Sequence, residues 1–248
     1  MIRRAILAGG LATLTLAFQM PLLAQNNGKT PPGDPCGSGP GKGTGNPCGG
    51  NNGNAGAQGN AGGAPTPFEP IVRPGTDRGV FINQIGATNF VAVRQEGTNS
   101  YFRAAQDGDG NRVTATQDVR DGYAAIAQKG DDNRVELAQD GTGQAVLLLA
   151  QEGELNAARI SQRDDGGSYS AAAVSQSGSG NQLSLTQDGS DNQARLIQNG
   201  DNNAMTAEQL GANNRLVWEQ DGSGLSDLRI TQTGGGAMQI VQTNGGGG

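Results

Sequence analysis

Aspartate directly follows glutamine at several points in this chain, as at Asp107, Asp118, Asp140, Asp188 and Asp221. Carboxylates at a repeated spacing could act as general acids and bases or bind calcium. They do not fit the Gly-Gly-x-Gly-x-Asp repeat of calcium-binding solenoids, and we interpret them as solvated edges of turns. The chain contains no histidine and only two cysteines. The sequence therefore predicts no catalytic, cofactor-binding or metal-binding residue, no small-molecule substrate, and a protein that is not an enzyme.

The two cysteines, Cys36 and Cys48, lie in matched surroundings, Asp-Pro-Cys-Gly and Asn-Pro-Cys-Gly. In an exported protein such a pair suggests a disulfide that closes a small loop. A cross-link between two chains is the alternative, and the sequence leaves both pairings open. Metal binding would need further ligands, and the chain has no histidine to supply them.

Glutamine recurs through the chain at an almost constant interval. Eleven of the 14 intervals are 10 or 11 residues. A stacked repeat explains this spacing, because each unit must place the same side chain against its neighbour. The fifteen residues are Gln84, Gln95, Gln106, Gln117, Gln128, Gln139, Gln151, Gln162, Gln176, Gln187, Gln198, Gln209, Gln220, Gln232 and Gln242.

Glycine and asparagine complete the repeat, which reads Gln-x-Gly-x-x-Asn. Glycine follows the glutamine by two residues in 12 of 15 units. Both residue types accept a positive φ at low cost and are typical of turns. The stretch from each asparagine position to the next glutamine has the length of a β-strand. Asparagine follows the glutamine by five residues at Asn89, Asn111, Asn133, Asn156, Asn181, Asn192, Asn203 and Asn214.

Apolar and polar residues alternate in these stretches. The positions two and four before each of the last 14 glutamines hold 28 residues, and all are apolar. The 42 positions one, three and five before the glutamine include 12 charged residues. A period of two indicates strands with one dry face, whereas a helical period would mix the two classes.

The spacing of the amides places them on the dry face. Asparagine and the closing glutamine stand six residues apart, an even number, so both side chains point the same way as the apolar residues. A buried amide is costly unless it is hydrogen-bonded. We expect each amide to donate to the same residue one layer away, about 4.8 Å along the stack. These glutamines and asparagines are therefore the predicted assembly ladder.

The predicted fold is all-β: a β-solenoid of about seven two-stranded 22-residue coils over residues 79–244, followed by a flexible glycine tail over 245–248. Fourteen strands, each ending at a glutamine, supply these coils. The longest interval, from Gln162 to Gln176, contains Asp164-Asp165-Gly166-Gly167. We interpret this insertion as a loop that bulges from one turn.

Residues 1–24 have the pattern of a secretory signal peptide. Arg3 and Arg4 precede an apolar run that ends at Ala24. A membrane anchor is the weaker alternative, because the run is short for a membrane span and contains Pro21. We therefore expect the mature protein to be secreted to the extracellular space or the cell surface. Residues 25–78 are rich in Gly, Asn and Pro, and we predict a disordered linker there.

The repeats resemble those of a known family. Ser100-x5-Gln106-x-Gly108-x-x-Asn111-x-Val113-x3-Gln117 is similar to the curlin repeat, Ser-x5-Gln-x-Gly-x-x-Asn-x-Ala-x3-Gln. The stretch 170–187 is a second match, and 122–139 is a third that lacks only the serine. The resemblance covers residues 79–244. Curlins are the subunits of curli, the extracellular functional amyloid of bacterial biofilms.

The resemblance implies a role and a set of partners. These are export through an outer-membrane pore, nucleated polymerisation with other copies and other curlin-like subunits, and a fimbria-like adhesive matrix. The chain departs from the family pattern, because it has more units than the usual five and because Val119 and Asp164 replace turn glycines. The role therefore stays open between major subunit, nucleator and longer accessory member.

Charge and the end of the repeats favour assembly over other functions. The formal net charge of −6 disfavours binding to nucleic-acid phosphates. The last predicted strand, 238–242, runs into glycines without a capping element, so its edge could template another molecule. We expect a structural subunit of curli-like fibres that supports cell adhesion and biofilm. The alternative is a monomeric secreted β-solenoid that binds ice, glycan or a surface.

The stretch 145–150, Ala-Val-Leu-Leu-Leu-Ala, is apolar on both predicted faces. It could form a lateral contact between fibres. A strand that is simply more hydrophobic than its neighbours is the alternative.

Overall fold

A computed structural model describes residues 68–166 and 168–244. These residues all belong to the compact unit that spans Pro65–Gly248. The predicted signal peptide 1–24, residues 25–67 of the predicted linker, Cys36, Cys48 and the predicted tail 245–248 lie outside the described residues. The described part contains no helix, and hence none long and apolar enough to cross a membrane.

The strands form two parallel sheets. Sheet A contains the odd-numbered strands, in the order β1 (Gly79–Ile85), β3 (Tyr101–Asp107), β5 (Tyr123–Lys129), β7 (Ala145–Glu152), β9 (Ser170–Ser177), β11 (Gln193–Asn199), β13 (Arg215–Asp221) and β15 (Ala237–Thr243). Sheet B contains the even-numbered strands, in the order β2 (Phe90–Gln95), β4 (Arg112–Val119), β6 (Arg134–Gly141), β8 (Ala157–Arg163), β10 (Gln182–Asp188), β12 (Ala204–Leu210) and β14 (Ile230–Thr233).

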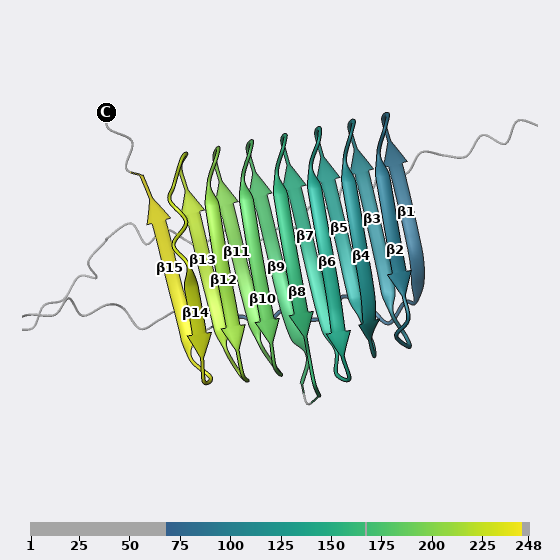
Figure 1. The fold of residues 1–248 in the computed structure, drawn as a ribbon, viewed down its shortest axis with the longest axis vertical. Helices are drawn as coiled ribbons and strands as arrows, with labels where there is room; N and C mark the ends of the chain where they lie inside the picture. The colour runs from purple at the N-terminus through teal and green to yellow at the C-terminus, as the bar shows by residue number, and fades with distance from the viewer. Residues whose placement is uncertain (1–67, 167, 245–248) are drawn as a thin grey trace, which may run out of the picture. The chain divides into compact units, whose positions relative to one another are not determined.

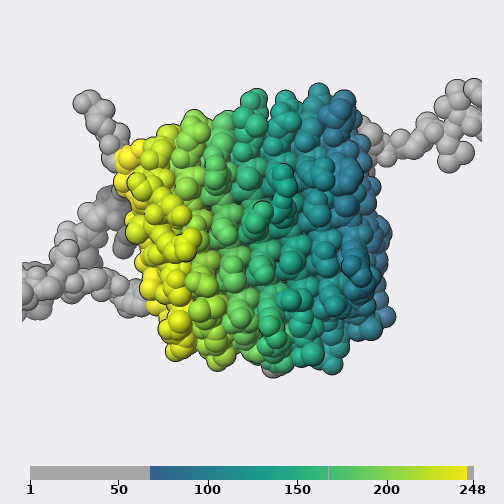
Figure 2. All heavy atoms as spheres, viewed as in Figure 1, coloured from purple at the N-terminus to yellow at the C-terminus, as the bar shows by residue number. Residues whose placement is uncertain are grey.

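The chain winds as a regular coil between the two sheets. Figure 1 shows the odd strands pointing one way in one layer and the even strands pointing the opposite way in the other. One odd strand and the following even strand make one coil, and the coils stack from β1 to β15. Figure 2 shows the successive coils as bands of colour across one broad face. The predicted all-β solenoid of about seven coils is therefore confirmed.

The described part of the chain forms fifteen strands where the sequence predicted fourteen. The additional strand is β1, which ends beside Gln84. The prediction measured each strand from one glutamine to the next, and no glutamine of the repeat precedes Gln84. The consequence is an odd number of strands, eight in sheet A and seven in sheet B.

Every strand pair has the same register, with glutamine opposite glutamine in all thirteen pairs. The insertions do not shift this register, because the turns absorb them. The longest one lies between β8 and β9, and Ser170 still pairs with Ala145 of β7. A slip of one residue would move the whole apolar set to the solvent side, so burial holds the register.

The core consists of the residues that the alternation placed inside. Of the 28 predicted inward residues, 22 form the buried cluster, and Val91, Val93, Ile230 and Ile240 pack against it. The remaining two, Leu228 and Met238, are exposed near the C-terminal end of the stack. The core therefore runs through the whole solenoid and is open at the ends.

Residues 68–78, which we call the strap, correct part of the predicted linker. The strap has no regular secondary structure, yet it lies along the outer side of sheet A (Figure 1). At its start, the Phe68 ring lies 5.9 Å from the Arg215 guanidinium. Further along, the Ile71 N–H donates to Gln193 Oε1 at 3.0 Å. The Arg73 guanidinium then donates to the backbone carbonyls of Asn99 and Asp121. Ile71 is 4% exposed. This segment orders because a folded apolar face is available to it.

The strap also accounts for the apolar stretch 145–150, which is most of β7. Between its contacts at β11 and beside β5, the strap crosses β9 and β7. The outward Val146 of β7 and Ala171 of β9 are both buried. Val146 is thus buried within a single chain, so the proposed lateral contact cannot use this side chain.

Candidate assembly site: amide ladders and open ends

The fifteen glutamines form two continuous columns of hydrogen bonds, which we call the Gln ladder. In each column the side-chain Nε2 donates to Oε1 of the glutamine one coil further along, at 2.7–2.9 Å. The column in sheet A runs from Gln84 to Gln242, and the column in sheet B from Gln95 to Gln232. All thirteen bonds point toward the C-terminal end of the stack.

Each glutamine from Gln106 onward makes a second bond that joins the two sheets. Its Nε2 donates to a backbone carbonyl at or near the start of the preceding strand, at 2.8–3.5 Å. Gln139, for example, donates to the Tyr123 carbonyl at 3.3 Å. The amide therefore closes its own coil and binds the next coil at the same time.

Burial of the Gln ladder changes only at the ends. Twelve of the fifteen side chains are buried. Gln84 is exposed, and Gln95 and Gln242 are half-buried. Because each buried amide has partners for its oxygen and its nitrogen, the interior contains little unsatisfied polarity. Among the described residues, only Arg73 Nε and Trp218 Nε1 are buried without a partner.

The asparagines bind mainly the backbone of the next coil, which differs from the expected amide-to-amide ladder. Seven of the eight are buried, and Asn89 is half-buried. Asn111 Nδ2 donates to the Gly130 carbonyl at 2.6 Å, and its Oδ1 accepts the Asn133 N–H at 3.1 Å. Direct donation between asparagine side chains joins four pairs, 111–133, 133–156, 156–181 and 192–214. Parity gave the correct face of each strand but could not identify the partner.

The turn glycines permit this asparagine contact. A Cβ on Gly130 would lie 2.2 Å from the Gly153 carbonyl oxygen, and the φ of Gly130 is 100°. That Gly153 oxygen accepts the Asn133 Nδ2–H at 2.7 Å. The same close approach recurs at Gly86, Gly108, Gly153, Gly178 and Gly200. The glycine of the Gln-x-Gly-x-x-Asn motif has no Cβ, so the turn carbonyl of the next coil can approach it closely. The asparagine of the same motif then donates a hydrogen bond to that carbonyl.

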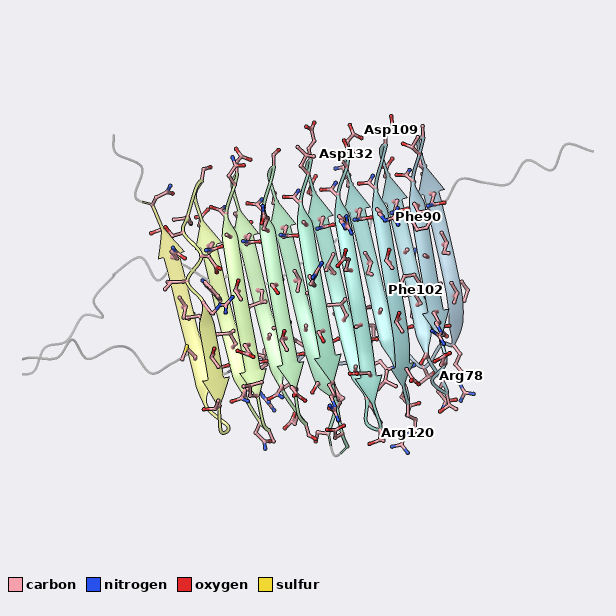
Figure 3. All side chains as sticks on the ribbon, in the orientation of Figure 1. Arg78, Phe90, Phe102, Asp109, Arg120 and Asp132 are labelled. Carbon is pink, nitrogen blue, oxygen red and sulfur yellow. The ribbon has the colours of Figure 1, made fainter. Side chains whose placement is uncertain are left out.

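The carboxylates considered first each occupy one of the last two positions of a strand, next to a turn. The five aspartates that follow a glutamine, Asp107, Asp118, Asp140, Asp188 and Asp221, are all exposed. Among the described residues no group of three or more acidic or cysteine side chains could hold a metal ion. Figure 3 shows the labelled Asp109 and Asp132 at one edge of the stack and Arg120 at the other.

Other turn carboxylates bind the backbone of a neighbouring coil. Asp131 Oδ1 accepts the Asp109 N–H at 2.7 Å, and Asp109 Oδ1 accepts the Ala87 N–H at 2.6 Å. Asp201 accepts the Ser179 N–H at 2.7 Å in the same way. These side chains satisfy turn N–H groups between coils.

Asp164 is an exception, because it is fully buried. Its carboxylate accepts the Gly166 N–H and the Ser170 hydroxyl, both at 2.9 Å. Burial raises the pKa of Asp164 above its ordinary value, and these hydrogen bonds oppose the increase. The sequence identified Asp164 as a replacement for a turn glycine and as the first residue of the inserted loop, and no periodic signal indicated its burial.

The two ends of the stack present unpaired strand edges. Within the described residues, β1 pairs only with β3, and β15 pairs only with β13. The inward side chains of the end strands are open to solvent, with Val80 42% exposed, Ile82 47% exposed and Met238 40% exposed. In the middle of the stack the equivalent positions are buried.

The Gln ladder ends differently on the two sides. At the N-terminal end, no described residue donates to Oε1 of Gln84 or Gln95. At the C-terminal end, Nε2 of Gln232 and Gln242 has no further glutamine to bind and donates to backbone carbonyls. One end therefore offers acceptors and the other offers donors.

Comparison of the chain with protein-family models, with curated proteins and with solved structures finds no match in any of the three.

Proposed function

We propose that this protein is an exported structural subunit that polymerises end to end into curli-like amyloid fibres. The curlin-like motif suggests the fibre class, and the solenoid supplies a repeating cross-β unit. In this proposal the fibres are extracellular and support adhesion in a biofilm matrix. The partners are further copies of the chain, other curlin-like subunits and an outer-membrane export pore.

The complementarity of the two ends carries the proposal. The N-terminal end combines an unpaired strand edge, exposed Val80 and Ile82, and free glutamine acceptors. The C-terminal end combines an unpaired strand edge, exposed Met238, and glutamine donors. A second copy that stacks head to tail would bury the apolar side chains, pair the edges and extend the ladder. Two identical ends that met would place acceptor against acceptor or donor against donor.

Fibre formation by the purified chain tests the proposal. We expect thioflavin-positive fibrils with a diffraction reflection at about 4.7–4.8 Å along the fibre axis. Sub-stoichiometric addition of the protein to another curlin would show whether it also nucleates. A chain that stays monomeric for days at high concentration would contradict the proposal and would favour the monomeric binding module.

A charge at the open end provides a sharper test. Ile82→Lys places an ammonium group in the exposed N-terminal end, where the unpaired monomer can solvate it but a stacked neighbour would bury it. We expect a folded monomer that does not elongate fibres. Thr114→Lys is the matched control, because Thr114 is exposed on the outer side of β4. This control should elongate fibres at a rate close to that of the unmodified chain.

A further inference from the structure

The number of strands determines how a second copy can continue the stack. This inference rests on the proposed end-to-end assembly. The coil starts in sheet A with β1 and finishes in sheet A with β15, so sheet A extends one strand beyond β14 of sheet B at the C-terminal end. The next position in the coil lies in sheet B directly after β14, and no strand of residues 68–166 or 168–244 occupies it.

A copy added in the same orientation would leave that place empty. Its β1 would pair with β15, and its β2 would then lie two layers from β14 instead of one. The edges of β14 and β2 would stay unpaired inside the fibre. Only the sheet A column would continue, from Gln242 to Gln84 of the next copy, while the sheet B column would be interrupted between Gln232 and Gln95 of the next copy.

A copy rotated by half a turn about the stack axis fills the vacancy. The rotation exchanges the two sheets and reverses the strand direction, so β1 of the next copy lies parallel to β14 and β2 lies parallel to β15. Both glutamine columns then continue, from Gln232 to Gln84 and from Gln242 to Gln95 of the next copy. The apolar rows also continue, with Ile230 against Ile82 and Ile240 against Val93.

We therefore propose that successive subunits are related by a half-turn, with β1 of each copy completing sheet B of the copy before it. The subunit then rises by seven and a half layers, or about 36 Å, and the structure repeats after two subunits at about 72 Å. The straps lie on alternate sides of such a fibre, since each strap covers sheet A of its own subunit.

Cysteine pairs in the full chain distinguish the two arrangements, in a background with Cys36→Ser and Cys48→Ser. Asn83→Cys with Thr231→Cys joins outward, exposed positions that face each other only after the half-turn. Asn83→Cys with Val241→Cys joins positions that face each other only without rotation. Neighbouring strands about 4.8 Å apart allow a disulfide, whereas cysteines on opposite sheets, at least about 10 Å apart, do not.

After fibres form and are mildly oxidised, we expect the 83/231 pair to give a ladder of covalent multimers on a non-reducing gel. The 83/241 pair should stay monomeric, as should each single-cysteine variant. Multimers from the 83/241 pair, from both pairs equally, or from neither pair in intact fibres would overturn the half-turn while leaving fibre assembly standing. Failure of the cysteine-free background to form any fibre would overturn both proposals.

Discussion

Gln139 lies in the interior of the Gln ladder and makes three side-chain hydrogen bonds. Its Oε1 accepts from Gln117 at 2.7 Å, and its Nε2 donates to Gln162 at 2.9 Å and to the Tyr123 carbonyl at 3.3 Å. Gln139→Ala removes all three bonds and leaves Gln162 Oε1 buried without its donor. We expect this substitution to be among the most destabilising single changes outside the apolar core.

The magnitude follows from the bonds that are lost. Three hydrogen bonds contribute about 1 kcal/mol each, and an unsatisfied buried acceptor costs about 1–3 kcal/mol more, so the free energy of unfolding should fall by about 4–6 kcal/mol. The matched control is Gln84→Ala at the open end. Gln84 is exposed and makes one ladder bond, to Gln106. Its removal takes the donor from Gln106 Oε1, but water can replace that donor at the exposed end, so the cost should be about 1 kcal/mol or less.

A carboxylate at the same position adds a pH test. Ionised Gln139→Glu can accept from Gln117 but cannot donate to Gln162 or to the Tyr123 carbonyl. Burial raises the pKa of such a carboxyl, so the folded state holds its proton more tightly than the unfolded state does. The stability of the variant should therefore fall as the pH rises through the ordinary glutamate pKa of about 4.3, and should recover in part below it.

Urea unfolding, at protein concentrations low enough to prevent assembly, measures the free energies of unfolding of these variants. Trp218 is the only tryptophan and is fully buried in β13, so its fluorescence reports the fold near the C-terminal end. Far-UV circular dichroism reports the whole sheet, and coincidence of the two transitions would justify a single free energy. If Gln139→Ala and Gln84→Ala cost the same within 1 kcal/mol, the ladder does not stabilise the monomer and the reasoning fails.

Four further substitutions test other features by the same unfolding measurements. Gly130→Ala should lower the free energy of unfolding by about 2–4 kcal/mol, because its Cβ would meet the next coil's carbonyl at a φ of 100°. Gly236→Ala is the control, because a Cβ there would meet no atom within 4 Å. Equal losses of stability in the two variants would refute the steric explanation. Leu155→Asn should stabilise by about 1 kcal/mol, because the 63% exposed Leu155 has a φ of 57°, and a loss of stability would contradict this. Ile71→Asp should lower the free energy of unfolding by about 2–3 kcal/mol and expose the strap to proteases. Val72→Asp, at a 64% exposed position, should do neither. Unchanged proteolysis of Ile71→Asp would show that the strap is not bound to sheet A. Because burial raises the pKa of Asp164, wild-type stability should fall relative to Asp164→Asn as the pH rises from the ordinary value of 3.8 toward 7. A pH-independent difference would show that folding does not shift the pKa of Asp164.

The repeat and its core could be predicted because both are written in short-range periodicities. Alternation assigns each strand residue to a face, and burial on one face leaves a single register. The regular glutamine spacing made the coil length countable. The inward rows that end at Leu228 and Met238 depart from the core only where the stack ends and no neighbour covers them.

Features without a repeat could not be predicted in the same way. The composition of the strap is typical of a disordered segment. The strap is ordered because it packs on the outer side of sheet A, whose strands are distant in the sequence. Strand β1 lacked a preceding glutamine to mark its start. The Asn111 side chain was placed on the correct face, but its choice of a backbone partner depends on how closely the glycine turns approach. Asp164 lies in an insertion, where no periodic position indicates burial.

Because all hydrogen bonds of the Gln ladder point in one direction, a filament of such subunits would have structural polarity, with two different ends. The thirteen hydrogen bonds of the Gln ladder within each subunit point along the same axis, and stacking would add their dipoles rather than cancel them. An incoming molecule would meet carbonyl oxygens at one tip and amide hydrogens at the other, so the two tips should elongate at unequal speeds. Growth from a labelled seed would therefore be asymmetric, with different elongation rates at its two ends.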